Sequence, residues 1–497
     1  MGFDFSSTER RRLGYQLIDR IDQYFSSLKD LPVQLPLDRR SFAALGDALP
    51  ELPSDATRVL DDLCSELIEY GFHVPSANYF GLMNPTPTYM AVLAEALVAA
   101  LNPQLASLAR SQLASRIEGE TVRWIASRVG WCKEEKTADE CAGPERCCDG
   151  TFTSGGNEAN FTALALALTA AFPAVVEDGI AAIGARPVLY ASAEAHHSLD
   201  KSTGLLGLGR RALRRIPVNQ SAQVDLALLE ARIQGDLAAD FRPFCVVGTA
   251  GTTNSGAIDD LPALAAIARR YGLWFHVDGA YGAAAIFSDR HRHLVAGIEL
   301  ADSLTLDPHK WLAMPFAAGV VLTSRPELLR KTFEVATPYM PRAAGAMQLD
   351  NFKVSTQWSR RMNSLKVWLT LRVHGRQAYE ELIDRQLALA GQMADWLATS
   401  DHFELAAPHP LPILNFRLRG CLNEEDAEAA HAALVEEATR DGHLWFSRTH
   451  VGGRSVLRMM VISYLTDEKN VAQLQHALTL AARRVLANRP NREPATL

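Results

Sequence analysis

The stretch that decides the fold is Ser303-Leu304-Thr305-Leu306-Asp307-Pro308-His309-Lys310-Trp311, a short apolar strand pattern that runs into a turn carrying a lysine. Lys310 stands between Pro-His and Trp-Leu-Ala-Met, although lysine side chains ordinarily stay solvated. An amine held among apolar neighbours loses part of its proton affinity and becomes a nucleophile. The alternative is a lysine whose stem lies on apolar surface while its ammonium reaches water. On this stretch alone both interpretations stay open.

A reactive lysine can bind a cofactor whose ring withdraws electrons, and such a ring needs an acidic partner. A second segment supplies this partner. Residues 273–278 form an apolar strand pattern that ends in Asp278. Small residues follow, including Ala280, and they let a ligand approach the backbone closely. A carboxylate at this place can hold a proton on a ring nitrogen.

Two further segments suit the rest of such a cofactor. Gly155, Gly156 and Asn157 form a glycine-rich turn that opens an Ala/Leu-rich helix, whose free N–H groups suit a phosphate. His196, in Ala-His-His-Ser, offers a flat imidazole that can stack on a ring. Each signal is weak alone, but together and in this order they favour a reactive Lys310.

Residues 150 to 325 alternate short apolar runs with helical patterns, which predicts an α/β fold with a mostly parallel sheet and helices on both faces. The expected strands are 150–152, 187–190, 244–248, 273–277, 302–306 and 318–322, and the helices between them include 161–171 and 261–271. Five candidate residues follow strands at the carboxyl edge, where open α/β sheets bind ligands: Gly155, His196, Thr253, Asp278 and Lys310.

This constellation resembles the group II pyridoxal-phosphate (PLP) amino-acid decarboxylases, most closely their aromatic-L-amino-acid decarboxylase branch. The resemblance covers nearly the whole chain, from the Arg-Arg-Arg-Leu-Gly segment at residue 10 to the Arg-Arg-Met-Asn-Ser-Leu-Lys-Val-Trp segment at residue 360. It implies a PLP-dependent type I (aspartate-aminotransferase-like) fold, an intertwined homodimer, and decarboxylation of an L-amino acid to the amine and CO₂. In this scheme Lys310 carries PLP covalently and Asp278 pairs with the ring nitrogen.

The resemblance implies further roles around the cofactor. The family pattern Ala-His-Ser-Ser favours His196 as the stacking residue, although the adjacent His197 leaves the register open by one position. Thr253 is expected near the ring oxygen or the substrate carboxylate, and His309 at the cofactor. Asp307 departs from the Asn of the aromatic branch. Because an acid beside a phosphate is electrostatically unfavourable, Asp307 is expected to point away or to pair with a cation.

Tyr339 matches the family's loop tyrosine, the proton donor to Cα after CO₂ has left. Family members with Phe at this position behave as aldehyde synthases, so Tyr339 favours plain decarboxylation. The alternative is a loop aromatic that only packs on a partner subunit.

The substrate side chain is expected at Phe80, Pro85 and Thr86, where the family has its aromatic pocket. No arginine stands out nearby to pair with an acidic side chain, which argues against glutamate. Met83 and Asn84 depart from the usual Tyr-Phe, so aromatic and non-aromatic amino acids both stay open. Two other functions remain alternatives: an aldehyde synthase or other carbon–carbon lyase on the same scaffold, and a non-catalytic PLP-binding protein.

Composition excludes several classes of protein. The chain has 497 residues, is 48% hydrophobic and carries a formal charge of −7 spread along its length. Nothing in this distribution favours nucleic acid or an anionic membrane. The first residues do not form a signal peptide, and no run of eighteen uncharged apolar residues predicts a membrane span. We therefore expect a cytoplasmic protein.

The chain is expected to divide into three parts. Residues 1–86 form an N-terminal helical dimerisation segment with helices at 8–29 and 55–70, because these helices have too little apolar surface to fold alone. Residues 87–372 form the large PLP-binding domain, with helices across 88–130. Residues 373–497 form a small α+β domain. Its expected elements are the end of a helix from 364 to about 399, strands at 413–418, 444–447 and 456–463, and a final helix from 467.

Seven cysteines, an odd number, favour unpaired thiols. Four of them cluster at Cys132, Cys141, Cys147 and Cys148. The spacing is not a paired C-x₂-C array and no histidine lies within it, so we expect incidental thiols and no metal. A disulfide formed in the purified protein is the alternative.

Overall fold

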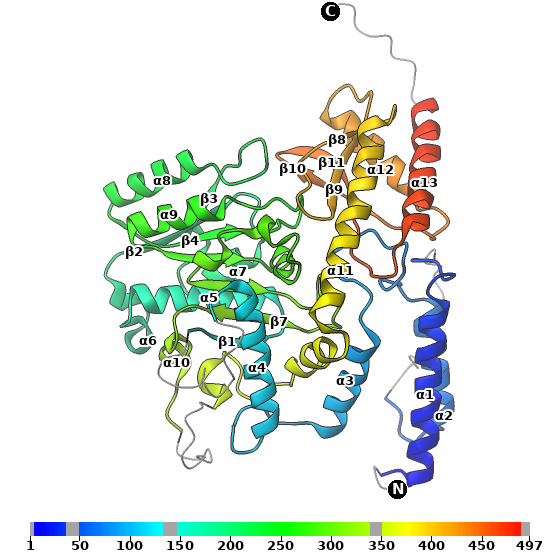
Figure 1. Cartoon of the computed structure of the whole chain (residues 1–497), viewed down its shortest axis with the longest axis horizontal. Coiled ribbons are helices and arrows are strands. Elements are labelled where there is room, and N and C mark those ends of the chain that lie inside the picture. Colours follow the sequence, from blue (N-terminus) through cyan, green and yellow to red (C-terminus); the bar gives the residue numbers. More distant parts are fainter. Residues whose placement is uncertain (1–3, 36–48, 133–146, 338–349, 489–497) are drawn as a thin grey trace, which may run out of the picture.

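The centre of the molecule is a seven-stranded sheet in the order β1-β7-β6-β5-β4-β2-β3 (Figure 1). The computed structural model describes residues 4–35, 49–132, 147–337 and 350–488. β7 runs antiparallel to both of its neighbours, β1 and β6, and the other pairs are parallel. The strands are Asp149–Thr153 (β1), Arg186–Ser192 (β2), Leu213–Ile216 (β3), Phe241–Thr249 (β4), Trp274–Asp278 (β5), Ser303–Leu306 (β6) and Gly319–Thr323 (β7).

The predicted α/β class and mostly parallel sheet are confirmed, and each of the six predicted strands is present. The prediction missed β3, in which two arginines separate the apolar residues Leu213 and Ile216. Two apolar residues at the ends of a four-residue run match neither the alternating nor the continuous strand pattern. β3 is a strand because it pairs with β2 in parallel register.

Helices cover both faces of the sheet, as predicted, because successive strand residues point to opposite sides. In β2, Val188 and Tyr190 pack into one hydrophobic cluster with residues of α4 (Gln112–Val129), α8 (Leu226–Ala238) and α9 (Leu261–Tyr271). Leu189 and Ala191 pack into a second cluster with residues of α5 (Gly156–Ala171) and α7 (Ser198–Leu205). Figure 1 shows α8 and α9 on one side of the sheet and α5 and α7 on the other.

The helices predicted across 88–130, at 161–171, at 261–271 and from 364 are present, whereas those at 198–205 and 226–238 had not been predicted individually. In the large part of the chain the helices of eight or more residues are Tyr89–Leu101 (α3), Gln112–Val129 (α4), Gly156–Ala171 (α5), Ser198–Leu205 (α7), Leu226–Ala238 (α8), Leu261–Tyr271 (α9) and Ser364–Thr399 (α11). α9 shows why the ends fall where they do. The Asp260 carboxylate accepts a hydrogen bond from the Ala263 N–H at the start, and Gly272 takes a left-handed conformation (φ 66°) at the end.

The backbone of α11 departs from helical geometry at Gly375 (φ 75°, ψ 169°), and a small lobe follows this helix. Its antiparallel sheet has the order β10-β11-β9-β8, with strands Phe403–Leu405 (β8), Ile413–Leu418 (β9), Ser447–Val451 (β10) and Arg454–Met460 (β11). Helices Glu424–Ala438 (α12) and Glu468–Ala487 (α13) cover it. The predicted strand at 444–447 was therefore wrong in position. The turn Gly452–Gly453 places the β10–β11 hairpin further along the chain.

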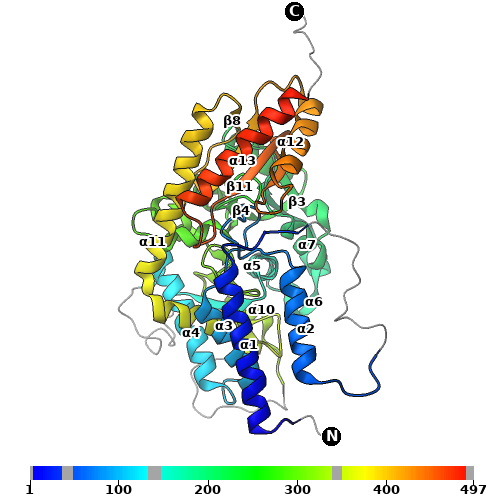
Figure 2. The ribbon, with the colours of Figure 1, turned by 90° about the vertical axis from the view of Figure 1, so that its right-hand side faces the viewer.

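The N-terminal helices Ser7–Ser27 (α1) and Ala56–Glu69 (α2) pack side by side at one side of the molecule (Figure 2). Neither helix has a buried residue. The Tyr24 hydroxyl reaches the His73 ring (3.1 Å), which joins α1 to the loop after α2. Across the part of the chain that the structure describes, no helix has the length and apolar character of a membrane span.

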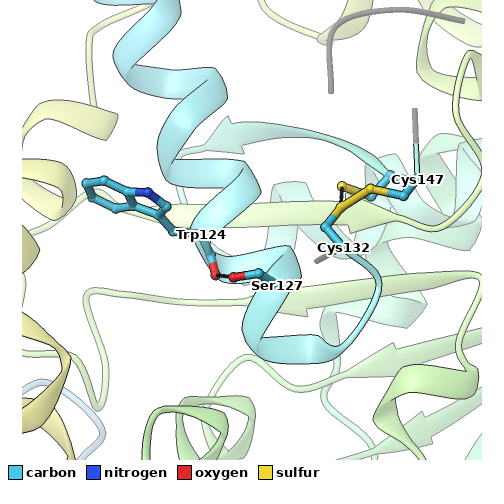
Figure 3. Close-up of a disulfide and its surroundings, with 5 residues drawn as sticks. Trp124, Ser127, Cys132 and Cys147 are labelled. Carbon is cyan, nitrogen blue, oxygen red and sulfur yellow. Dashed lines mark hydrogen bonds between the residues drawn. A yellow bond between two sulfur atoms is a disulfide. The ribbon is translucent and has the colours of Figure 1, made fainter. Parts of the chain in front are cut away.

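The expectation of unpaired thiols was wrong for two cysteines. Cys132, on the loop after α4, forms a disulfide with Cys147, just before β1 (Figure 3). The Cα atoms are 5.7 Å apart, within the ordinary range for a disulfide. Sequence spacing could not show this pairing, because the antiparallel register of β1 and β7 and the end of α4 together bring the two residues close.

Candidate active site

A cavity of about 360 Å³ opens at the carboxyl edge of the parallel strands. It is lined by the residues that follow the ends of β1, β2, β4, β5 and β6, which is where doubly wound sheets bind ligands. The predicted site residues that line it are Gly155, Gly156, Asn157, His196, Thr253, Asp278, Ala280, His309 and Lys310. Nine residues predicted from separate motifs thus lie around one space.

The glycine-rich turn forms one wall of the cavity. Gly155 caps α5 and Gly156 is its first residue, so the N–H groups of the first turn, which have no partner inside the helix, lie at this wall. A Cβ on Gly156 would lie 2.7 Å from the Asp307 Oδ2 and 3.2 Å from the Ala280 Cβ. A side chain at this position would collide with its neighbours, and glycine leaves the helix terminus accessible to an anion.

Asp278 ends β5 and is almost fully buried, with 5% of its surface exposed. Its Oδ2 accepts a hydrogen bond from the Asn160 side-chain amide (2.8 Å), and its Oδ1 accepts one from the Ala280 N–H (3.2 Å). Charge-assisted bonds of this kind hold a carboxylate in one orientation. The carboxylate is therefore fixed where it lines the cavity.

A chain of buried hydrogen bonds stands behind Asp278. A carboxylate oxygen only accepts, so the Asn160 amide presents its NH₂ to Asp278 and its Oδ1 to the His276 Nε2 (3.1 Å). Burial lowers the pKa of His276 to about 4, so the ring is neutral and carries its proton on Nε2. Its Nδ1 then accepts from the Ser303 hydroxyl (2.9 Å), which in turn accepts from the Trp274 indole N–H (2.8 Å). Every donor in this chain points toward Asp278.

Lys310 follows β6 and extends its ammonium into the cavity, with 22% of the side chain exposed. Its Nζ lies 3.2 Å from the Asp307 Oδ2, and the His309 Nε2 lies 3.6 Å from the same oxygen. The expectation that Asp307 pairs with a cation therefore agrees with its contacts. The other oxygen of Asp307, Oδ1, is buried and has no hydrogen-bond partner among the described residues.

The two histidines of the site are held by backbone donors. The Nδ1 of His196 accepts from the Ser198 N–H (3.1 Å), and that of His309 accepts from the Ala318 N–H (3.0 Å). Desolvation by the surrounding protein lowers the pKa of both rings. His196 is the more exposed of the two residues and lines the cavity. Both rings present Nε2–H when neutral.

A sequence profile of the pyridoxal-dependent decarboxylase conserved domain matches residues 39–419. The chain belongs to this family. An aromatic-L-amino-acid decarboxylase of Bacillus atrophaeus is 31% identical over 490 residues, 98% of each chain. The solved structure of Oryza sativa TDC with PLP and tryptamine has a TM-score of 0.89 at 26% identity and covers 97% of this chain and 99% of that one. The phenylacetaldehyde synthase of Arabidopsis thaliana is 26% identical and covers 94% of both chains.

Membership of this family makes the chain a PLP-dependent amino-acid decarboxylase, a carboxy-lyase of fold type I, as predicted. The residues present also fit the cofactor. The first turn of α5 suits its phosphate, the Lys310 amine its aldehyde carbon and the Asp278 carboxylate its ring nitrogen. A volume of about 360 Å³ lies in the usual range for small-molecule sites.

The predicted substrate-side-chain residues lie elsewhere. Phe80 is buried in the core of the small lobe, and the Thr86 hydroxyl reaches the Pro75 carbonyl (2.6 Å) and the Ser463 hydroxyl (2.8 Å). Neither these two nor Pro85 is among the described residues that line the cavity, whereas Met83 of the same loop is. The role of the three residues stays a prediction. Tyr339 lies outside the described residues.

Several residues of the cavity wall were not predicted from the sequence: Asn160, Thr249, Tyr281 and Phe316. Asn160 could have been found, because it is a polar residue on the buried face of an otherwise Ala/Leu-rich helix. The Tyr281 ring stacks on the Trp311 indole (5.1 Å between centroids), so Tyr281 fixes the residue next to Lys310. The Tyr281–Trp311 contact leaves no local sequence signal.

Proposed function

We propose that this decarboxylase converts an aromatic L-amino acid into the corresponding amine and CO₂. The observation that carries the proposal is the convergence of Lys310, Asp278 and the first turn of α5 on one cavity. Lys310 is the residue that holds PLP covalently, and α5 holds its phosphate. The choice between amino acids rests on the apolar part of the wall.

Bound PLP supplies an electron sink for the bond to the departing carboxylate. Asp278, oriented by Asn160 and by the Ala280 N–H, keeps a proton on the ring nitrogen. His196 would stack on the cofactor ring, and Thr253 would orient the substrate carboxylate. Tyr339 delivers a proton to the substrate Cα, so that the product is an amine.

An aromatic substrate agrees with the cavity wall. Met83, Tyr281 and Phe316 supply apolar surface, and the Phe316 ring lies 4.7 Å from the His309 ring. Among the described lining residues, Lys310 is the one lysine or arginine. An acidic substrate side chain would therefore be desolvated without a cation of its own, which is unfavourable by several kcal/mol. The similarity to an aromatic-L-amino-acid decarboxylase supports the same choice.

The test is incubation of the PLP-loaded enzyme with each of the twenty amino acids, with amine and CO₂ measured together. We expect one or more aromatic substrates to give equal amounts of both. The Lys310→Ala variant is the matched control, since it retains the rest of the cavity. Glutamate as the best substrate would contradict the proposal. Aldehyde, ammonia and peroxide from the wild-type enzyme would favour an aldehyde synthase, the activity named for the Arabidopsis relative.

We infer that the enzyme is a homodimer with its N-terminal helices at the interface. α2 leaves three large apolar side chains exposed, Val59 (51%), Leu63 (41%) and Leu67 (63%), and α1 leaves Tyr15 exposed (60%). Clustered apolar surface of this kind is characteristic of subunit contacts. Light scattering is expected to give twice the mass of the chain. A fully active monomer would contradict the inference.

A further inference from the structure

Three cysteine sulfurs meet at the start of β1. The Sγ atoms of Cys132, Cys147 and Cys148 all lie within 4.8 Å of one another. Cys132 is buried, and the other two are partly exposed. In Figure 3 the chain passes from α4 through a loop to Cys132, which faces Cys147.

A disulfide accounts for only two of these sulfurs. The third, Cys148 Sγ, lies 3.0 Å from the Cys132 Sγ, although the Cys132–Cys147 pair does not require it there. Sulfurs that share a tetrahedral zinc ion lie about 3.8 Å apart, because each Zn–S bond is about 2.3 Å long. A group of three within 4.8 Å therefore has the dimensions of a thiolate metal site.

The three ligands come from anchored segments, as a metal site requires. Cys132 follows the C-cap Gly130, and the Trp131 indole N–H donates to the Glu299 carbonyl (2.8 Å). Cys147 and Cys148 immediately precede β1, which pairs with β7 along its whole length. Neither side needs a change in backbone to bring the sulfurs together.

We propose that Cys132, Cys147 and Cys148, in their reduced form, bind one zinc ion. Thiolates are soft ligands that favour zinc, and three of them fill three tetrahedral positions. The fourth position is left to water or another donor. Cys141 lies between them in the sequence but outside the described residues, and it is not part of the site proposed.

The disulfide is the two-electron oxidised state of the same site. A phosphine reductant supplies the two electrons that break the Cys132–Cys147 bond. One water molecule supplies two protons, which the sulfurs take up, and its oxygen becomes the oxygen of the phosphine oxide. Zinc then displaces the thiol protons, as metal binding to cysteine does. Disulfide and zinc are therefore mutually exclusive states.

The site is distinct from the PLP cavity. Cys148 precedes β1 and the phosphate-binding turn follows it, so the five-residue strand separates them by about 17 Å. Zinc here fixes the end of α4 to the start of β1. We expect this metal to stabilise the fold without taking part in decarboxylation.

The experiment measures zinc in the full-length, PLP-loaded enzyme. The protein is reduced with a phosphine, incubated with zinc sulfate, desalted and analysed by plasma mass spectrometry. We expect about one zinc per chain in the wild type and at least a tenfold loss in Cys148→Ser. This variant decides between the two accounts, because it keeps both cysteines of the disulfide and removes only the third ligand. Cys421→Ser, on the small lobe, is the matched control and is expected to retain zinc.

Two results would overturn the proposal. One is reduced wild-type protein that holds less than about a tenth of a zinc per chain. The other is zinc retained in Cys148→Ser, which would place the metal elsewhere. Cobalt substitution adds a readout that does not depend on folding stability: the wild type is expected to show thiolate-to-cobalt charge-transfer absorption, and Cys148→Ser to lose it. Absence of this band in the wild type would also refute thiolate ligation.

Discussion

Asn160 offers the sharpest test of how the active site is held. Its side chain makes three buried hydrogen bonds, to Asp278, Ser198 and His276. Asn160→Ala removes all three, and the Asp278 Oδ2 loses the donor that lies 2.8 Å away. Because Asp278 is the group proposed to face the PLP ring nitrogen, we expect PLP to bind more weakly.

The magnitude follows from the lost contact to Asp278. A hydrogen bond to a charged group contributes about 1.5–3 kcal/mol, whereas neutral bonds contribute about 1 kcal/mol each. If the charged contact is lost mainly in the PLP-bound state, the dissociation constant of PLP rises by about tenfold to a hundredfold. Loss of the two neutral hydrogen bonds lowers the stability of the apoprotein instead. This effect is measured separately, by thermal unfolding without PLP.

The assay titrates apoprotein with PLP and follows the cofactor absorbance together with the quenching of protein fluorescence. Thr162→Ala is the matched control, because Thr162 is buried on the same helix and, among the described residues, its hydroxyl bonds only to the Glu158 carbonyl of that helix (2.9 Å). A double-mutant cycle with Asp278→Asn isolates the contact, since the two substitutions are expected to be non-additive. Equal PLP affinity in Asn160→Ala and Thr162→Ala would refute the proposed role of the hydrogen-bond chain.

Three further predictions concern other parts of the enzyme. Lys310→Ala is expected to lose the covalent PLP adduct that borohydride traps in the wild type, and mass spectrometry of the reduced protein would contradict the assignment if it found the adduct on another residue. Tyr339→Phe is expected to form less amine and, in air but not under nitrogen, to release aldehyde, ammonia and peroxide. If the variant formed as much amine as the wild type and no peroxide, Tyr339 would be a packing residue only. Burial lowers the pKa of His431 from 6.5 to about 4, so the unfolded chain takes up the proton first as pH falls. His431 should therefore contribute full stability above pH 6.5 and lose about 2 kcal/mol of it between pH 7 and 4.5, a dependence that denaturant titrations of His431→Gln should lack.

The sequence was sufficient for those features that depend on local pattern. Apolar runs with helices between them predicted the strands, and the residues after strand ends predicted nine members of one cavity wall. The sequence could not show contacts that join distant segments. The Thr86 hydroxyl, for example, bonds to the Ser463 hydroxyl, 377 positions away. No periodicity in the segment between α2 and α3 carries that information.

Register decided the other errors. β3 was overlooked because two arginines occupy its centre, and only pairing with β2 makes it a strand. In the small lobe, the Gly452–Gly453 turn determines where β10 ends and β11 begins, and the apolar run at 444–447 does not. The glycine pair was visible in the sequence, and a two-residue hairpin turn flanked by alternating residues would have placed the strand correctly.

Asp307 shows how sequence and structure complement each other at the site. The sequence identified it as a departure from the family's Asn, but could not say where its charge would be balanced. In the fold, Asp307 lies between Lys310 and the first turn of α5, with Oδ2 near the Lys310 Nζ and 2.7 Å from the position of a Gly156 Cβ. A carboxylate there neutralises the lysine but opposes a phosphate at the helix terminus. The same residue thus stabilises the apoprotein and disfavours the cofactor's phosphate, and an amide at this position would remove both effects together.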